Sequence, residues 1–351
     1  MEIRVLDENF IINEVVDTFE SCLWIERFFE HGEFEIYTSP TEKLLTALQN
    51  GYYLQNDESG KTMIIDTKRI VTNVTDGDKL IVTGKTLESI LQRRVIWGQK
   101  TIQGSLQDGI ETLLDENVIN PTNTDRQISN FIFNPASDSE ITSLTIEAQY
   151  FGDNLYDVIV DLCETNSIGF SVTLIDGDFV FRLETGTDRS SEQLDTPQVT
   201  FSPEFDNLLS SEYTESERDH KNTVMVAGEG DISDKEIVSV TDGGTGLGRI
   251  EGYSNSSGVS RLVDGTEIPL ADYQEQLKQK GKEYLNKHET TKEFDSEVDT
   301  NTSFKYNVDF YMGDVLEVSN EYGISEKVRV TEFLISQSKK GVEAYPVFSK
   351  I

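Results

Sequence analysis

Residues 19–38 read FESCLWIERFFEHGEFEIYT, and this stretch decides how the first part of the chain folds. Apolar and aromatic residues fill both of its halves, 19–29 and 33–38, and the pair His31-Gly32 stands between them. Glycine readily takes the positive φ that a tight hairpin turn needs. The stretch therefore predicts two antiparallel strands joined at Gly32.

Two more hairpins are expected between residues 52 and 82, because turn sequences rich in Asp and Gly separate short apolar runs. Three antiparallel hairpins in series are typical of a meander or a small barrel. The runs and turns are 52–55, 57–60 and 63–66 for the second hairpin, and 70–74, 75–78 and 80–82 for the third.

Between residues 86 and 185 the apolar residues change to helical spacing. Ser105 and Asp108 match the capping pair that starts many helices. Apolar residues from Leu155 to Cys163 occupy positions i, i+3, i+4, i+7 and i+8, which is one face of a helix. This part is predicted to be an α+β unit. Its expected elements are a helix through 87–94 capped by Thr86, helices at 106–114 and 155–163, and strands at 170–175 and 179–183 joined by Asp176-Gly177.

The last part of the chain returns to strands after a polar stretch, 184–193, which is the clearest candidate for a linker. Pro269 stands where proline favours the first turn of a helix, and that helix is expected to end near His288. Strands and helices do not alternate, which disfavours a doubly wound parallel sheet. Strands are expected at 198–201, 223–227, 304–310, 315–319, 327–334 and 342–348, with long loops on short strands across 228–266.

The charge is the outlying bulk property of the chain. Sixty-four acidic residues against 30 basic ones give a formal net charge of −34. This excludes binding to nucleic acid through its phosphates, because such binding needs concentrated Lys and Arg. Two interpretations stay open: the acidic residues keep the protein soluble, or some of them line a surface that DNA passes without adsorbing.

The N-terminus lacks the basic and then apolar segments of a secretory signal, so we expect synthesis in a cytoplasm. No apolar run reaches the ~18 residues that a membrane-spanning helix needs. Cys22 and Cys163 fit no CxxC pattern, and we predict two buried thiols and no disulfide.

No motif for catalysis or metal binding is found. His31, His220 and His288 have no second ligand at metal spacing and are expected at the surface. The glycine-rich stretch 243–248 is not followed by a helix start, so we expect a flexible loop and no nucleotide site. The acidic stretch 231–236 matches no calcium loop. We predict no catalytic, cofactor-binding or metal-binding residue, no cofactor, and a protein that is not an enzyme.

Four segments, taken together and in order, resemble a siphophage and prophage family of tail-tip proteins, which is similar to the wider group of baseplate hubs of the late-control-D type. The resemblance runs over nearly the whole chain. The segments are FESCLWIER (19–27) leading into GEFEIY (32–37), TGKTLESILQRR (83–94), KNTVMVAGEG (221–230) and YNVDFYMGDVLEV (306–318).

The resemblance implies a β-rich α+β fold with two small antiparallel, tail-tube-like β-barrels and an α+β middle domain. The expected domains are a barrel part at 1–85, the α+β domain at 86–190, and a second barrel region at 191–351 with a helix inserted at 269–290. The resemblance also implies that residues 306–318 form a barrel strand, a turn at Gly313-Asp314 and the start of the next strand.

The same resemblance implies a function and partners. The chain is expected to form a homotrimeric ring at the virion tail tip that continues the tail tube. A tail-tube or distal tail protein is expected above it, and tip, fibre or lysin proteins below it. DNA would pass through without specific binding.

Two alternatives stay open. The chain could be a cell-wall carbohydrate-binding tail protein, which predicts exposed aromatic side chains in one groove. It could also be a glycan hydrolase that uses two carboxylates in a cleft.

Overall fold

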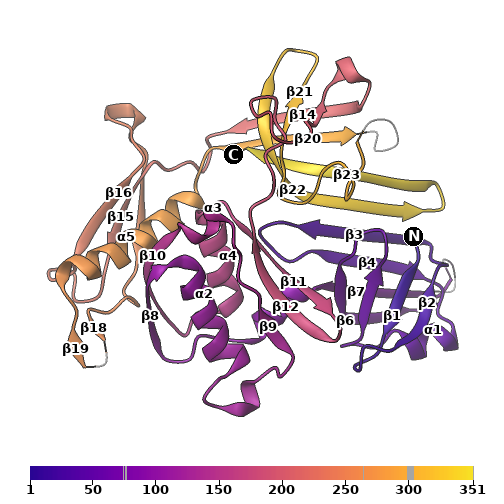
Figure 1. Ribbon diagram of the computed structural model, residues 1–351, viewed down its shortest axis with the longest axis horizontal. Helices are drawn as coiled ribbons and strands as arrows, with labels where there is room; N and C mark the ends of the chain where they lie inside the picture. Colours follow the sequence, from indigo (N-terminus) through magenta and orange to yellow (C-terminus); the bar gives the residue numbers. More distant parts are fainter. Residues whose placement is uncertain (74, 76, 264, 299–303, 351) are drawn as a thin grey trace. The chain divides into compact units, whose positions relative to one another are not determined.

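The computed structural model of the protein contains two compact units, and each combines segments that lie far apart in the sequence (Figure 1). Unit 1 contains Met1–Ser89, Gly169–Tyr213 and Glu293–Ile351. Unit 2 contains Ile90–Ile168 and Thr214–Lys292. The structure describes residues 1–73, 75, 77–263, 265–298 and 304–350.

The N-terminal segment of unit 1 folds into an antiparallel sheet, as its turns predict. Hydrogen-bonded neighbours follow the order β3–β4–β7–β6–β5–β1–β2. The second and third expected hairpins share β6, which runs through both predicted apolar runs with a bulge between Ile65 and Thr67. Val74 and Asp76 of the third hairpin, and Asp264 of the predicted loops, lie outside the described residues. The elements are β1 (Ile3–Leu6), β2 (Ile12–Val16), β3 (Ser21–Arg27), β4 (Glu33–Thr38), α1 (Glu42–Ala47), β5 (Tyr53–Asn56), β6 (Thr62–Val71) and β7 (Lys79–Thr86).

The C-terminal strands join the same sheet through one long strand, β22. Its first part pairs with β21, and its second part pairs with β3 on one side and β23 on the other. Figure 1 shows the yellow β22 beside the indigo β3, although their sequences are about as far apart as the chain allows. These elements are β13 (Thr200–Phe201), η4 (Pro203–Phe205), β14 (Leu208–Ser216), β20 (Thr291–Val298), β21 (Val315–Ser319), β22 (Ser325–Ser338) and β23 (Gly341–Lys350).

The β-rich fold that we predicted is confirmed, but the two closed barrels are not found. Among the described residues the 13-stranded sheet is an open path whose ends are β2 and β14. Strand β22 joins the two groups of strands into one open sheet. It pairs with β3 of the N-terminal group on one side and with β23 of the C-terminal group on the other. Sharing a strand also satisfies the edge that β3 would otherwise leave unpaired.

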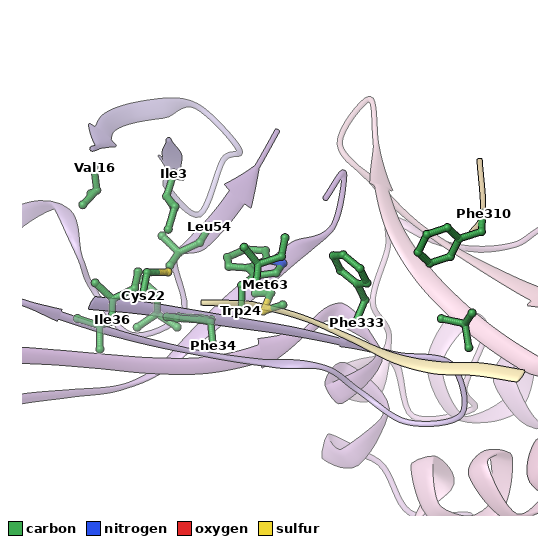
Figure 2. Close-up of a cluster of buried hydrophobic side chains, with 14 of the residues drawn as sticks. Ile3, Val16, Cys22, Trp24, Phe34, Ile36, Leu54, Met63, Phe310 and Phe333 are labelled. Carbon is green, nitrogen blue, oxygen red and sulfur yellow. The ribbon is translucent and has the colours of Figure 1, made fainter. Parts of the chain in front are cut away.

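The core of unit 1 is continuous across the shared strand. Trp24 and Phe34 stack with ring centroids 6.0 Å apart on the N-terminal strands. In the view of Figure 2, Phe333 of β22 lies between Trp24 and Phe310. Phe310 also packs on Phe201, with centroids 5.6 Å apart. One hydrophobic cluster therefore holds strands from all three segments of the unit.

The hairpin β11 (Gly169–Ile175) and β12 (Asp178–Glu184) forms as predicted, with Asp176 and Gly177 at positive φ in its turn. The stretch after it is not the linker that we expected. Ser190 is fully buried and the backbone of Asp188 forms a bridge with Val315, so the middle of this stretch is fastened to the sheet. The predicted division into 1–85, 86–190 and 191–351 groups the chain differently from the two units, and it stays a prediction.

Unit 2 contains a three-stranded sheet, in the order β16–β15–β17, and its longest helix, α5, packs against all three strands. Val226 of β15 and Leu277 of α5 are fully buried in a cluster of their own. The predicted helices at 106–114 and 155–163 form, and Ser105 caps the first by accepting from the Asp108 amide at 3.3 Å. The elements are β8 (Gln99–Ser105), α2 (Leu106–Leu114), η2 (Asp115–Ile119), η3 (Thr124–Arg126), β9 (Phe131–Phe133), α3 (Ser139–Thr142), β10 (Thr145–Phe151), α4 (Leu155–Thr165), β15 (Thr223–Ala227), β16 (Ile237–Thr241), η5 (Gly246–Gly248), β17 (Glu251–Asn255), β18 (Leu262–Val263), β19 (Thr266–Glu267) and α5 (Leu270–Asn286).

Three local predictions were wrong. Gly32 does not have a positive φ; it is needed because a Cβ there would overlap the Ile25 carbonyl oxygen. Thr86 does not cap an α-helix, since its hydroxyl accepts from the Gly32 amide at 2.8 Å and a 3₁₀ helix, η1 (Leu87–Arg93), follows. Residues 304–310 form a turn and no strand, with Asn307 at φ 62.

Candidate functional site

A buried network of charged side chains lies inside unit 1. Glu26 of β3 is 1% exposed, and the Tyr306 hydroxyl donates to its Oε2 at 2.9 Å. Lys61, which follows the β5–β6 turn, approaches Glu88 of η1 with Nζ 3.8 Å from Oε1. Glu88 is 3% exposed and accepts from the Val172 amide at 3.1 Å. The network therefore contacts all three segments of the unit.

The local sequence explains why Glu26 is buried. Side chains alternate along a strand, and Glu26 follows Cys22 and Trp24 on the face of β3 that points to the core. Glu184 of β12 adds a third carboxylate, which accepts from the Ser171 hydroxyl. Buried carboxylates require donors or a cation, and this network supplies both.

The electrostatics of the network follow from its burial. Burial raises the pKa of the Glu26 carboxyl, and the positive charge of Lys61 opposes this only in part. Burial lowers the pKa of Lys61, but the carboxylates of Glu88, Glu184 and Glu26 together raise it above its ordinary value. Burial, together with Glu26, also raises the pKa of Tyr306. Lys61 therefore stays charged, while Glu26 resists ionisation.

A second buried charge fastens the segment that we expected to be a linker. Asp314 is 2% exposed and accepts from Arg189 Nε at 2.5 Å, from the Thr187 amide at 2.7 Å and from the Tyr311 amide at 3.0 Å. Arg329 adds bonds to the carbonyl oxygens of Thr185 and Gly313, at 2.7 and 2.8 Å. The predicted turn at Gly313-Asp314 is therefore an anchoring point.

Unit 2 has a buried polar network of a different kind. The Tyr150 hydroxyl donates to Glu283 Oε1 at 3.4 Å, and Lys280, one turn earlier on α5, donates to Glu283 Oε2 at 2.9 Å. The Lys280 ammonium also lies 4.5 Å from the centre of the Tyr150 ring. Gln149 bonds to the Ser260 backbone in both directions, at 2.7 and 3.0 Å.

These networks hold the fold and offer no access for a glycan substrate. A hydrolase needs its two carboxylates in an open cleft. Glu26 and Glu88 are almost completely buried, so a polysaccharide chain cannot reach them. Where the structure is described, no cluster of three or more His, Cys, Asp or Glu has the arrangement of a metal site.

Both predicted buried thiols are confirmed. Cys22 is 1% exposed, and burial raises the pKa of its thiol to about 12. Cys163 is fully buried, and burial raises the pKa of its thiol as well. Thiols with raised pKa values are unreactive at neutral pH, because the thiolate is the nucleophile.

The histidines are half-buried, not at the surface as predicted. His31 Nδ1 lies 3.2 Å from the Gly32 carbonyl oxygen, and burial lowers its pKa. His288 stacks on Tyr284, with ring centroids 4.1 Å apart, and its Nδ1 lies 2.7 Å from the Tyr284 carbonyl oxygen. His220 Nδ1 lies 3.4 Å from the Thr290 hydroxyl. Each histidine therefore lies within hydrogen-bond distance of another group of the protein.

Among the described residues, neither the glycine-rich stretch 243–248 nor the acidic stretch 231–236 forms a phosphate or metal site. Residues 243–248 are exposed and include only the 3₁₀ turn η5, so no helix N-terminus faces a phosphate position. In the acidic stretch 231–236 the side chain of Ile232 is 93% exposed.

None of the described helices combines the length and hydropathy that a membrane crossing requires.

An open hollow of about 340 Å³ on unit 1 is the feature that the sequence did not indicate. We call it the lysine hollow, because Lys79, Lys339 and Lys340 lie around it. Lys339 and Lys340 are the two turn residues of the β22–β23 hairpin, and Lys79 starts β7. The remaining lining residues are Glu20, Ser21, Tyr37 and Ser338.

Comparison with known proteins places the chain in a family. The family described as Siphovirus ReqiPepy6 Gp37-like protein matches residues 2–348. No curated protein sequence matches the chain. The resemblance to a siphophage and prophage family that the four segments indicated is therefore confirmed.

Three solved structures share the fold over nearly their whole length. They are a tail protein from Neisseria meningitidis MC58 (TM-score 0.60, 14% identity, 99% of this chain and 96% of that one), the 43 kDa tail protein of prophage MuSo2 from Shewanella oneidensis (0.61, 11%, 100% and 98%) and prophage tail protein gp18 from Listeria monocytogenes EGD-e (0.55, 14%, 100% and 95%). At these identities the likeness shows the fold. The chain belongs to the Siphovirus ReqiPepy6 Gp37-like protein family, and it shares the fold of these three tail proteins.

Proposed function

We propose that the chain is a structural protein of a long-tailed phage tail and that three copies form a ring at the tail tip. The observation that carries this proposal is the extent of the likeness: the fold of the Neisseria and Shewanella tail proteins covers 99% and 100% of this chain. The family membership over residues 2–348 agrees with it. The chain is then a hub that continues the tail tube.

The interior of unit 1 supports a structural role. Charged groups are costly to bury unless they are paired, and here they fasten chain segments to one another. The carboxylates of Glu26 and Glu88 are closed to a large substrate. A role without catalysis is therefore the function that this interior favours.

The charge supports a role as a conduit. With a net charge of −34 per chain, a ring of three copies around a channel repels DNA and lets it pass without adsorbing. In this proposal the ring contacts a tail-tube or distal tail protein above and tip, fibre or lysin proteins below. A channel wall that is neutral or basic would overturn the conduit role.

Mass photometry and negative-stain imaging of the purified protein test the ring. We expect a species with three times the 39.6 kDa mass of one chain, seen as three-fold rings with a central hole. A protein that stays monomeric at every concentration contradicts the homotrimer. A pull-down on purified cell walls separates the carbohydrate-binding alternative, which predicts retention of the monomer.

A further inference from the structure

The lysine hollow lies on the outer face of the N-terminal sheet. Ser338 of β22 pairs with Ser21 of β3, and Ser21 pairs with Tyr37 of β4, so these side chains form one row across three strands. The neighbouring positions Cys22 and Ile36 point to the opposite face and are buried in the core. The hollow is therefore open to a partner.

The charge of the hollow is opposite to that of the chain. Three lysines and one glutamate line it, on a protein with 64 acidic and 30 basic residues. Lys339 and Lys340 are exposed at the hairpin tip. Within the described part of the chain none of the three lysines has a salt bridge, whereas Lys287 and Lys327 pair with Asp161 and Glu192. Among the described residues, the hollow thus presents three cations without a salt-bridge partner, beside the single carboxylate of Glu20.

The chemistry that fits this hollow is a group of carboxylates. Lysine ammonium groups bind anions as flexible point charges, and the hydroxyls of Ser21, Tyr37 and Ser338 supply further hydrogen bonds. Nucleic acid phosphate is disfavoured as the occupant, because the rest of the chain repels it. An acidic polypeptide is the occupant that the charges favour.

Copies of a chain with this net charge repel one another unless a basic surface meets an acidic one. We propose that the lysine hollow receives carboxylates from a second copy of this chain at the subunit contact of the ring. The inference rests on the proposed ring and adds to it the surface through which the copies recognise each other. The contact is heterologous, because a basic surface of one copy meets an acidic surface of the next, and such contacts form a ring where the rotation between copies closes.

Cross-linking with a zero-length carbodiimide tests the identity of the occupant, because this reagent joins an amine to a carboxylate only in direct contact. Equal amounts of unlabelled and ¹⁵N-labelled protein are mixed, so that a link between copies gives light–heavy peptide pairs. We expect such pairs from Lys79, Lys339 or Lys340. If these lysines form no light–heavy pair while the exposed Lys282 does, the proposal is overturned.

Charge reversal tests the contribution to assembly. We expect the variant K79E/K339E/K340E to associate at least about tenfold more weakly than the wild type. Raising the salt concentration should weaken the association of the variant less than that of the wild type. The control R93E/K282E/K305E has the same change in net charge at three exposed positions and should assemble as the wild type does. A milder triple Lys→Gln variant gives the same direction with less effect on folding, which thermal unfolding monitors.

The outcomes separate the contact from the ring. A hollow variant that forms rings as well as the wild type, with the same salt dependence, overturns the contact and leaves the ring intact. A wild type that never assembles overturns both. If a single-stranded oligonucleotide binds the wild type and not the hollow variant, the occupant is phosphate and the proposal is wrong.

Discussion

The two units bury the same chemical pair, a glutamate with a tyrosine hydroxyl, in different ways. In unit 2 Tyr150 meets Glu283, which also pairs with Lys280 three residues away on the same helix. In unit 1 Tyr306 meets Glu26 across 280 positions of sequence, and the cation Lys61 forms an ion pair with Glu88 at 3.8 Å. In the first network local helix geometry supplies the cation, although Tyr150 on β10 lies 133 positions from Glu283. In the second network Glu26 meets its tyrosine only when distant segments have come together.

This difference predicts how strongly substitutions in each buried network destabilise the unit that contains it. Glu283 keeps a partner when Tyr150 is lost, since its i,i+3 pair with Lys280 forms within helix α5 itself. A network between segments leaves a buried charge without its partner. We therefore expect substitutions in unit 1 to be more destabilising than matched substitutions in unit 2.

The largest effect is expected at Asp314. Asp314→Ala removes the acceptor of Arg189 and of two backbone amides in a buried position, which should cost about 3–5 kcal/mol of unfolding free energy. Denaturant unfolding measures it. The control in unit 2, Glu251→Ala, breaks the exposed pair with Arg249 and should cost less than about 1 kcal/mol. Equal losses in the two variants would contradict the anchoring role of Asp314.

Alanine substitutions at Gly313 and Gly323 distinguish the cost of side-chain crowding from the cost of backbone strain. Gly313 has φ +85, and a Cβ there would overlap the Phe28 ring, so Gly313→Ala should cost about 2–4 kcal/mol. Gly323 has the similar φ of +80 with open space around it, and Gly323→Ala should cost only about 1 kcal/mol. The difference between the denaturation midpoints of the two variants isolates the contact with Phe28. Equal midpoints would show that the loop moves away from the ring and that the contact costs nothing.

Matched hydroxyl deletions compare the two networks directly. Tyr306→Phe removes a hydroxyl donor from the buried Glu26 carboxyl and should cost about 1–3 kcal/mol. Tyr150→Phe should cost less than about 1 kcal/mol, because Glu283 keeps Lys280 at 2.9 Å. Thermal unfolding of both variants in one buffer is the measurement. A larger loss for Tyr150→Phe would reverse the comparison.

The smallest effect is a pH dependence. The pKa of Glu26 is raised by burial above its ordinary value of 4.5, so the folded state holds this proton more tightly than the unfolded state does. Stability is therefore lost as the pH rises from 4.5 through the folded pKa. Glu26→Gln removes this loss and keeps an acceptor for Tyr306. We expect the variant to melt above the wild type at pH 7, with a gap that closes towards pH 4.5. A gap independent of pH would exclude Glu26 as its cause.

Local signals carried most of the fold prediction. The pair Asp176-Gly177 and the capping pair Ser105 and Asp108 form the predicted turn and cap, because their chemistry involves only near neighbours. Residues 304–310 were predicted wrongly, since Tyr306 and Phe310 alternate like a strand while Asn307 takes the positive φ of a turn. The shared use of β22 could not be predicted, because no local pattern specifies a partner 300 positions away.

The candidate sites were less accessible to sequence reasoning. The alternation of Cys22, Trp24 and Glu26 in β3 did carry a signal, since a charge on the core face of a strand requires a buried partner. The lysine hollow had no such signal. It joins Lys79 to the hairpin tip at Lys339 and Lys340, and only the pairing of β22 with β3 brings these positions to one place.

The shared strand β22 has a consequence for how the protein is made. Arg27 of β3 and Glu332 of β22 bond to each other across 305 positions, so the N-terminal sheet leaves the ribosome long before its neighbour exists. At about 5–20 residues per second, the free edge of β3 waits roughly 15–60 s for β22. During that time the nascent chain exposes an unpaired edge and half of an aromatic core. Its dense negative charge then acts as protection, because it keeps neighbouring nascent chains apart until synthesis reaches the strand that completes the sheet.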